Sequence, residues 1–260
     1  NSNLFYSEVL SGIESEAKKE GYNVLIYNTR GSIDEEEKAI KIMISHRVEG
    51  IIIDPLVEES KKNLNEINKR KIPFVQASHY LNIDANWVGY DDISASYKVT
   101  NYVIKNNRNR LIFFGGYPGD STYDDRIIGF KKALQENNLE FSKNNIINCE
   151  VEFEEVYKKT KNIIDQLNAD AICAYNDLSA LAIIKALREK DYKIPDDIAV
   201  TGIDNLFISE LVNPGLTTVN LPKKQAGKEA VKMIVDEIEN GINNTKKLSL
   251  SVDLIKRQSV

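Results

Sequence analysis

Several residue types that build common functional sites are scarce in this chain. It has two cysteines and two histidines in 260 residues, and neither cysteine has a second Cys or a His at the spacing of metal ligands. His46 and His79 lie far apart in the sequence, so we interpret each as a surface or structural residue rather than a catalytic base. We therefore expect no metal, no cofactor and no catalytic residue. Cys149 and Cys173 are predicted to be buried free thiols.

Signals for export and for membrane insertion are also missing. No stretch approaches the roughly 18 apolar residues of a membrane helix, and Asn1 to Tyr6 contains no basic segment followed by an apolar one. A formal net charge of −5 makes the chain a poor match for a phosphate backbone. We therefore predict a cytoplasmic protein without membrane contact, whose DNA-binding part, if it has one, lies outside this sequence.

The motifs of the common enzyme classes are absent as well. Nothing matches a phosphate-binding loop that ends in Gly-Lys-Ser/Thr, a nucleophile elbow, a dinucleotide fingerprint or a paired-His zinc helix. The glycine-rich stretch from Gly115 to Gly119 lacks the following lysine, so we interpret it as a turn that leaves a strand. These absences argue against an enzyme.

What the sequence does contain is a regular alternation of strand-like and helical segments. Apolar residues at helical spacing alternate with short apolar runs such as Ile51-Ile52-Ile53, which predicts βαβ units and parallel sheets covered by helices on both faces. The predicted helices include residues 5–20, 92–106, 124–137, 154–167, 178–189 and 222–239. The predicted strands are residues 22–27, 51–53, 72–77, 87–90, 111–114, 146–149, 171–175, 198–203 and 248–255. So many strands favour two sheets, and the polar stretch from Asn106 to Arg110 is the best linker candidate.

Polar and aromatic residues follow the predicted strands. Because ligands bind outside the carboxyl ends of parallel strands, these residues are the candidates for a site. They are Asn28 to Arg30, Asp54, Gln76 to Ser78, Tyr90 to Asp92, Gly115 to Tyr117, Asn176 with Asp177, and Asp204 with Asn205; Arg126 follows soon after Tyr117. Carboxylates, amides, an arginine fork and aromatic rings together are typical of a carbohydrate site.

Some of these residues also have plain structural explanations. Asp177 is expected to be the N-cap of the helix that follows it, and Asp92 could be a cap in the same way. Arg126 is placed in the first turn of a helix, where its charge opposes the helix dipole, so an anionic or hydroxylated partner explains it better. Phe5 and Tyr6 could equally belong to the core or to the site.

Several segments resemble the LacI/GalR repressors, and the resemblance covers nearly the whole chain. The segments most specific to the family are Tyr175 to Arg188, Ile194 to Asn205, Asn213 to Pro222 and Leu254 to Val260; Arg126-Ile-Ile-Gly-Phe130 and Asn3 to Glu14 also match its pattern.

The resemblance implies a periplasmic-binding-protein type I fold. Two doubly wound α/β subdomains, residues 1–107 with 219–246 and residues 108–218 with 247–260, would be joined by three crossovers and would hold a ligand between them. It further implies that Arg126, Asn176 and Asp204 contact a small effector, a sugar or sugar phosphate, with Asp92 and Phe5 or Tyr6 as additions. It also implies a homodimer, with the helix from Glu35 to Ser45 and the stretch Ile208 to Val212 at the interface.

The chain departs from the family pattern at its start. Family members begin with a helix-turn-helix headpiece and an apolar strand, which this sequence does not show, so we expect it to be part of a longer polypeptide that contacts operator DNA through that headpiece. A lobe without the first strand would have an open edge beside Val24 to Ile26. The alternative reading, an exported sugar-binding receptor, is disfavoured by the segments Asn213 to Pro222 and Leu254 to Val260.

Overall fold

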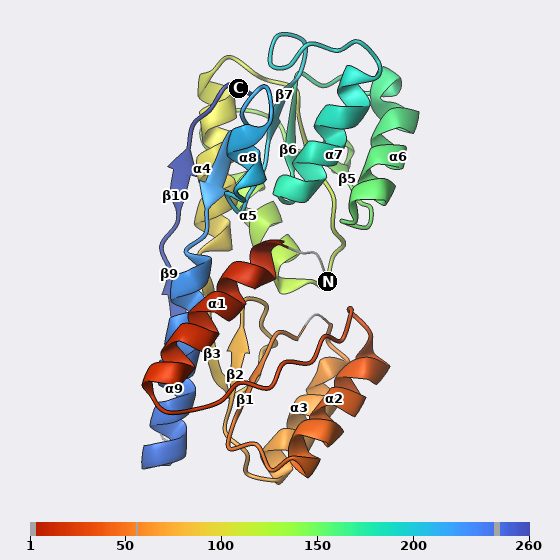
Figure 1. Cartoon of the computed structure of the whole chain (residues 1–260). Coiled ribbons are helices and arrows are strands. Elements are labelled where there is room, and N and C mark those ends of the chain that lie inside the picture. Colours follow the sequence, from red (N-terminus) through yellow and green to blue (C-terminus); the bar gives the residue numbers. More distant parts are fainter. Residues whose placement is uncertain (1–3, 56, 242–244) are drawn as a thin grey trace. The chain divides into compact units, whose positions relative to one another are not determined.

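The computed structural model describes residues 4–55, 57–241 and 245–260, and they form two compact α/β units (Figure 1). Unit 1 comprises Asn1–Tyr90 and Pro222–Leu250, and unit 2 comprises Asp91–Leu221 and Ser251–Val260. The chain passes between the units at residues 90/91, 221/222 and 250/251. The predicted fold class, two parallel-sheet subdomains joined by three crossovers, is confirmed.

The division between the units differs from the predicted boundaries. Helix α4 (Asp92–Lys105), expected in the first subdomain, belongs to unit 2. It packs along α5 (Ser121–Glu136) of the same unit. The supposed linker is anchored there too, since the backbone N–H groups of Asn109 and Arg110 donate to the carboxylate of Asp170. Polar composition suggested a linker, but the backbone of this stretch makes hydrogen bonds within one unit.

The sheet of unit 1 is parallel, with the strand order β1-β2-β3-β9. The strands are β1 (Ile51–Ile53), β2 (Phe74–Ala77), β3 (Asn86–Tyr90) and β9 (Lys247–Leu250). Helices α2 (Ile33–Ser45) and α3 (Ser60–Lys69) cover one face, and α1 (Leu4–Lys19) with α9 (Lys223–Asn240) covers the other (Figure 1). A Cβ at Gly227 would lie 2.1 Å from the Val9 carbonyl oxygen. Only glycine at this position lets α1 and α9 approach so closely.

The predicted strand from Tyr22 to Tyr27 does not form. The segment has no regular secondary structure, and no described strand pairs with it, although its residues favour strands. A β-strand needs a neighbour that completes its hydrogen bonds, so local propensity alone does not produce one. Val24, Leu25 and Ile26 remain 39%, 49% and 49% exposed.

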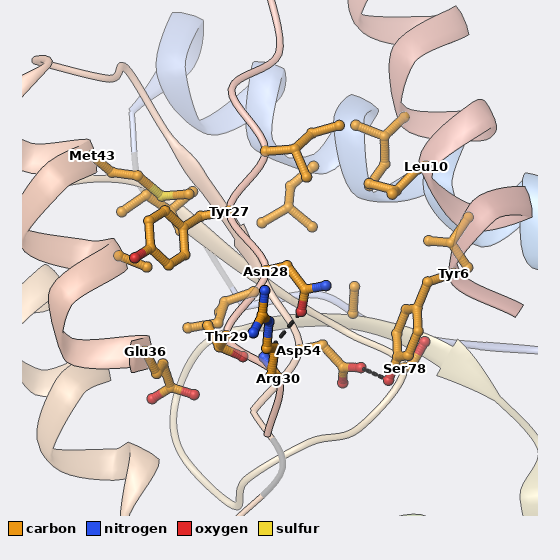
Figure 2. A pocket seen from close by; sticks show the side chains of 18 of the residues that line it. Tyr6, Leu10, Tyr27, Asn28, Thr29, Arg30, Glu36, Met43, Asp54 and Ser78 are labelled. Atoms are coloured by element: carbon orange, nitrogen blue, oxygen red, sulfur yellow. Dashed lines mark hydrogen bonds between the residues drawn. The ribbon is translucent and has the colours of Figure 1, made fainter. Parts of the chain in front are cut away.

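An apolar cavity of about 350 Å³ lies beside this segment in unit 1. Its walls come from α1, α2, β1 and this segment, and they include Val9, Ile13, Ile26, Ile40 and Ile53. Figure 2 shows Leu10 and Met43 on opposite sides of this space, with Tyr27 near Met43. The core of unit 1 is therefore incompletely filled along the edge of the sheet next to β1.

Unit 2 contains a second parallel sheet, with the order β5-β4-β6-β7. Its strands are β4 (Leu111–Phe114), β5 (Ile146–Ile147), β6 (Ala171–Ala174) and β7 (Ala199–Thr201). Helices α4 and α5 pack on one face, and α6 (Phe153–Ile163) and α7 (Asp177–Arg188) pack on the other (Figure 1). The short helix α8 (Ile208–Leu211) follows β7.

The last predicted strand, residues 248–255, is two strands in different units. Strand β9 pairs in parallel with β3 of unit 1. After a break at Ser251 and Val252, β10 (Asp253–Ile255) pairs antiparallel with β8 (Thr218–Asn220) in unit 2. The alternating apolar pattern continues across the break, so the sequence did not indicate it. Residues 247–250 belong to unit 1 and not, as predicted, to the second subdomain.

A test of the unit 2 core uses two neighbouring residues of α5. Phe130 is 0% exposed and packs against Phe113 with ring centroids 5.8 Å apart, whereas Ile128 is 50% exposed. We expect Phe130→Ala to lower the free energy of unfolding by about 3–5 kcal/mol, because it leaves a cavity. Ile128→Ala should change it by no more than about 0.5 kcal/mol. Urea denaturation followed by circular dichroism measures both, and equal losses would contradict the packing described.

Candidate ligand-binding site

Arg126 lies on α5 at the carboxyl ends of the unit 2 strands. The helix begins at Ser121, and Asp120 is its N-cap, with Oδ1 accepting from the backbone N–H groups of Thr122 (2.8 Å) and Tyr123 (3.3 Å). Arg126 is therefore in the second turn, not the first as predicted, and the argument from the helix dipole loses its basis. Its placement is explained by burial and by its partners instead.

The Arg126 guanidinium is buried, with 4% of the residue exposed. Nε donates to Asp92 Oδ1 at 2.7 Å, and Nη1 donates to the carbonyl oxygen of Tyr175 at 2.5 Å. Nη2 lies 4.0 Å from Asp204 Oδ1. The guanidinium carbon stands 4.8 Å above the centroid of the Tyr175 ring. The structure thus brings together three of the predicted residues, Arg126, Asp92 and Asp204, within one unit.

The charges of this cluster are fixed by their surroundings. Burial would lower the pKa of Arg126, but the nearby Asp92, Tyr175 and Asp204 outweigh it, so the pKa lies above its usual value. Burial and the neighbouring Asp120 raise the pKa of Tyr175 well above its usual value, and the Tyr175 hydroxyl donates to Asp120 Oδ2 at 2.9 Å. The cluster therefore presents a permanent cation beside two acidic residues and a neutral phenol.

Helix caps are assigned differently from the prediction. Asp91, not Asp92, caps α4 by accepting from the backbone N–H of Ser94 at 2.8 Å, so the Asp92 carboxylate is directed to Arg126. Asn176, not Asp177, caps α7, with its side-chain oxygen 2.8 Å from the Ser179 nitrogen. Asn176 thus has a structural task that the prediction gave to Asp177. Its predicted contact with a ligand stays a prediction.

Asp204 occupies a tight bend after β7. Its backbone φ is +129°, and that of Asn205 is +52°. Both angles are positive, and residues other than glycine have positive φ angles only uncommonly. The backbone N–H of Asp204 donates to the carbonyl oxygen of Val219, in β8 (Thr218–Asn220), at 2.9 Å. The residue is buried, with 5% exposed. The bend therefore places a buried carboxylate at the carboxyl end of the sheet, close to Arg126.

Phe5 and Tyr6 lie in unit 1, where they take part in a separate group. The Tyr6 hydroxyl donates to Asp54 Oδ2 at 2.5 Å (Figure 2). Asp54 Oδ1 accepts from the backbone N–H of His79 at 3.0 Å and lies 2.8 Å from its Nδ1. Phe5 packs edge-on against Tyr90 at 5.9 Å. Both residues therefore lie at the carboxyl ends of β1, β2 and β3.

Sequence reasoning did not connect His79 with Asp54. The pair could have been found from the order of the strands, because Asp54 follows β1, Ser78 and His79 follow β2, and these strands are neighbours.

The predicted glycine turn is confirmed, since Gly115 and Gly116 have φ values of +109° and +78°. A Cβ at Gly116 would lie 2.7 Å from the Tyr123 ring, so the turn closes tightly over aromatic side chains.

No group of three His, Cys, Asp or Glu residues among the described residues could hold a metal ion. The described helices include none that is both long and apolar enough to cross a membrane. Cys149 and Cys173 are buried free thiols, as predicted, and burial raises the pKa of each to about 11.

Comparison with known proteins identifies the fold and its family. A periplasmic binding protein-like domain matches residues 100–260. The PurR repressor of Vibrio atlanticus is 28% identical over 266 residues, which cover 100% of this chain and 78% of that protein. A LacI-type transcriptional regulator from Bacillus cereus subsp. cytotoxis is 27% identical, with a TM-score of 0.90 over 98% of this chain and 92% of that one. The CelR regulator in complex with cellobiose gives a TM-score of 0.91 at 22% identity, over 98% and 79% of the two chains.

The chain belongs to the periplasmic binding protein-like domain family. Within that family it is homologous to the PurR and LacI-type transcription repressors, and it corresponds to their effector-binding core. The relatives are regulators rather than enzymes, and the alternative of an exported receptor is not favoured.

Removal of Asp92 should be much more costly than removal of its neighbour. Asp92→Ala leaves the buried guanidinium without the acceptor of its Nε–H, so we expect a loss of about 3–5 kcal/mol in the free energy of unfolding. Asp91→Ala removes only a helix cap and should cost about 1 kcal/mol. Chemical denaturation of the two variants at pH 7 gives the comparison. If both variants lose the same small amount, the buried ion pair does not hold unit 2 together.

Proposed function

We propose that this chain senses a small polyhydroxylated effector, a sugar or sugar phosphate, for a transcription repressor, and that Arg126 and Asp204 bind its hydroxyl groups. The observation that carries the proposal is the 4.0 Å separation of Arg126 Nη2 and Asp204 Oδ1. A separation of 4.0 Å is too long for a hydrogen bond. At this distance the two side chains form an ion pair without a direct hydrogen bond, and they present a charged donor and a charged acceptor side by side.

A hydroxyl group suits such a pair chemically. Its oxygen can accept from the guanidinium while its proton is donated to the carboxylate, and both bonds are charge-assisted. Because Arg126 and Asp204 are each about 95% buried, these bonds would form away from water. The Tyr175 ring beside the guanidinium adds the kind of aromatic surface that covers the apolar face of a sugar. The complex of the CelR regulator with cellobiose makes this disaccharide a natural first probe.

Control of transcription follows from the family. The relatives are DNA-binding repressors, while this chain carries a net charge of −5, which disfavours contact of its own surface with DNA. We propose that the effector prefers one conformation of this core and thereby changes operator affinity in a DNA-binding segment of the same protein. An operator titration of the full protein with and without the effector tests this coupling.

Binding measurements test the two proposed contact residues. A hydrogen bond to a charged group contributes roughly 1.5–3 kcal/mol, so Arg126→Ala and Asp204→Ala should each raise the Kd of the effector about tenfold to a hundredfold or more. The matched control is Arg108→Ala, because Arg108 also bonds backbone carbonyls of unit 2, those of Pro195 and Asp196, but lies before β4 rather than after a strand. Isothermal titration against cellobiose, ribose, ribose 5-phosphate and purine bases measures the affinities.

The outcomes separate binding from structure. If the best probe binds Arg126→Ala and Asp204→Ala as tightly as it binds the parent, the two residues only stabilise unit 2. Tight binding of a purine base alone would contradict the sugar class and leave the repressor function intact. The Arg108→Ala variant should keep the parent affinity in either case.

We also propose that the protein is a homodimer, since operators with twofold symmetry require a twofold protein. In unit 2, Phe207 and Leu211 are 75% and 65% exposed at α8, which is unusual for adjacent large apolar side chains. Val212, which we also expected at the interface, packs against the core of unit 2. Met43 of α2 likewise packs against the core of unit 1. The exposed residues of α8 are therefore the better-supported part of the predicted interface.

Sedimentation velocity at micromolar concentration tests this interface. Leu211→Asp should convert the dimer to a monomer, because it places a charge in an apolar contact. Ile128→Asp, which changes an exposed residue on α5, should leave the dimer intact. A parent chain that sediments as a monomer would count strongly against the proposal, and so would equal dissociation by both variants.

A further inference from the structure

Asp177 is a buried carboxylate that accepts hydrogen bonds from the chain after β7, from α8 and from β8. The residue is 0% exposed and lies at the start of α7. Oδ2 accepts from the backbone N–H of Leu206 at 2.8 Å and from the Ser209 hydroxyl at 2.6 Å. Oδ1 accepts from the Thr218 hydroxyl at 2.5 Å. One side chain thus joins α7 to the chain after Asp204, to α8 and to β8.

The Thr218 hydroxyl extends these contacts to the strained bend. Its proton is donated to Asp177, so its oxygen can accept from the backbone N–H of Asn205, which lies 3.3 Å away. Asp177 therefore determines the orientation in which Thr218 holds Asn205. Leu206, which donates directly to Asp177, follows immediately, so the bend at Asp204 and Asn205 is fixed from its carboxyl side.

Other contacts hold the same bend from the side of β8 and the chain end. The Asn205 side chain accepts from Arg257 Nη2 at 2.8 Å and donates to Asn220 Oδ1 at 3.2 Å. A Cβ at Gly202, directly after β7, would lie 2.3 Å from Asp177 Oδ1, so only glycine lets the chain and the carboxylate approach so closely here. A φ of +129° at Asp204, a residue other than glycine, persists only where surrounding contacts impose it.

We propose that Asp177 is a positioning residue of the effector site, which holds the Asp204–Asn205 bend through Thr218 and Leu206 and so keeps the Asp204 carboxylate opposite Arg126. The proposal deepens the proposed function and rests on it for the effector. Asp177 does not touch the effector itself. Loss of its carboxylate leaves the fold of unit 2 in place but lets the bend relax toward ordinary backbone angles.

The first test needs no effector. Asp177→Asn replaces one acceptor oxygen by an NH₂ group that cannot accept, so at least one of the donors around it loses its hydrogen bond to the carboxylate. We expect the side-chain Nε–H resonance of Arg126 in a ¹⁵N-labelled sample, identified by its loss in Arg126→Lys, to shift as Asp204 moves. Thr218→Val should cause the same shift, whereas Thr218→Ser, which keeps the hydroxyl, should restore the parent spectrum.

The matched control is Asp170→Asn. Asp170 is also a buried aspartate of unit 2 that accepts from backbone N–H groups, those of Asn109 and Arg110, but it precedes β6 instead of following it. We expect this variant to lower the melting temperature and to leave the Arg126 resonance unchanged. If Asp177→Asn behaves in the same way, Asp177 is a structural residue only and the proposal is wrong. If Asp177→Asn does not fold, the Arg126 resonance in Thr218→Val and Thr218→Ser decides whether the proposal is correct.

The second test measures affinity for whichever of cellobiose, ribose and ribose 5-phosphate binds the parent most tightly. Asp177→Asn should raise its Kd about tenfold, and Asp170→Asn should not. Combined with Asp204→Asn, Asp177→Asn should add no further loss, because it acts through Asp204. Additive losses would overturn the proposal. If none of the probes binds the parent, the proposed effector class fails, while the Arg126 resonance still decides the role of Asp177.

Discussion

The arrangement of unit 2 depends on the buried charge of Arg126. A guanidinium cannot lose its proton under ordinary conditions, so its burial requires partners that replace water. Asp92 at the start of α4 and the Tyr175 carbonyl after β6 provide direct hydrogen bonds, and Asp204 after β7 adds a nearby negative charge. Three segments far apart in the sequence are thereby held around one side chain. The same constraint that stabilises this edge of the sheet also creates a polar group suited to a ligand.

The bend that carries Asp204 illustrates how a strained backbone is maintained. Asp204 and Asn205 adopt positive φ angles without the freedom of glycine. Hydrogen bonds of Asn205 to Thr218 in β8 and to Arg257 near the chain end offset this strain. The Thr218 hydroxyl is in turn held by its hydrogen bond to Asp177. Strands β8 and β10 lie next to the second and third crossovers between the units. Asp204 is therefore hydrogen-bonded to strand β8, which leads directly into the second crossover.

Unit 1 shows the opposite situation, in which a segment with a strong local preference for strand has no partner strand among the described residues. Tyr22 to Tyr27 has the composition of a buried strand, yet it stays outside the sheet, with Leu25 and Ile26 about half exposed. The apolar cavity between this segment and β1 has the same cause. Apolar residues on α1 and α2 face the cavity and lose part of the packing that a filled core would give them.

The sequence by itself determined the fold class, the alternation of helices and strands, and the residues at the carboxyl ends of the strands, because hydrophobic periodicity is a local property of the chain. It also singled out Arg126, Asp92 and Asp204, which the structure brings together in one unit. Tertiary structure alone decided that Asp91 and Asn176 are the helix caps, that α4 belongs to unit 2, that residues 248–255 divide between two sheets, and that Tyr22 to Tyr27 forms no strand. The unit to which α4 belongs, the division of residues 248–255 and the absence of the strand depend on hydrogen bonds and packing between residues distant in sequence, which no local pattern records. The caps themselves are local hydrogen bonds, but Asp92 and Asp177 bond to distant partners instead, Asp92 to Arg126 and Asp177 to Thr218.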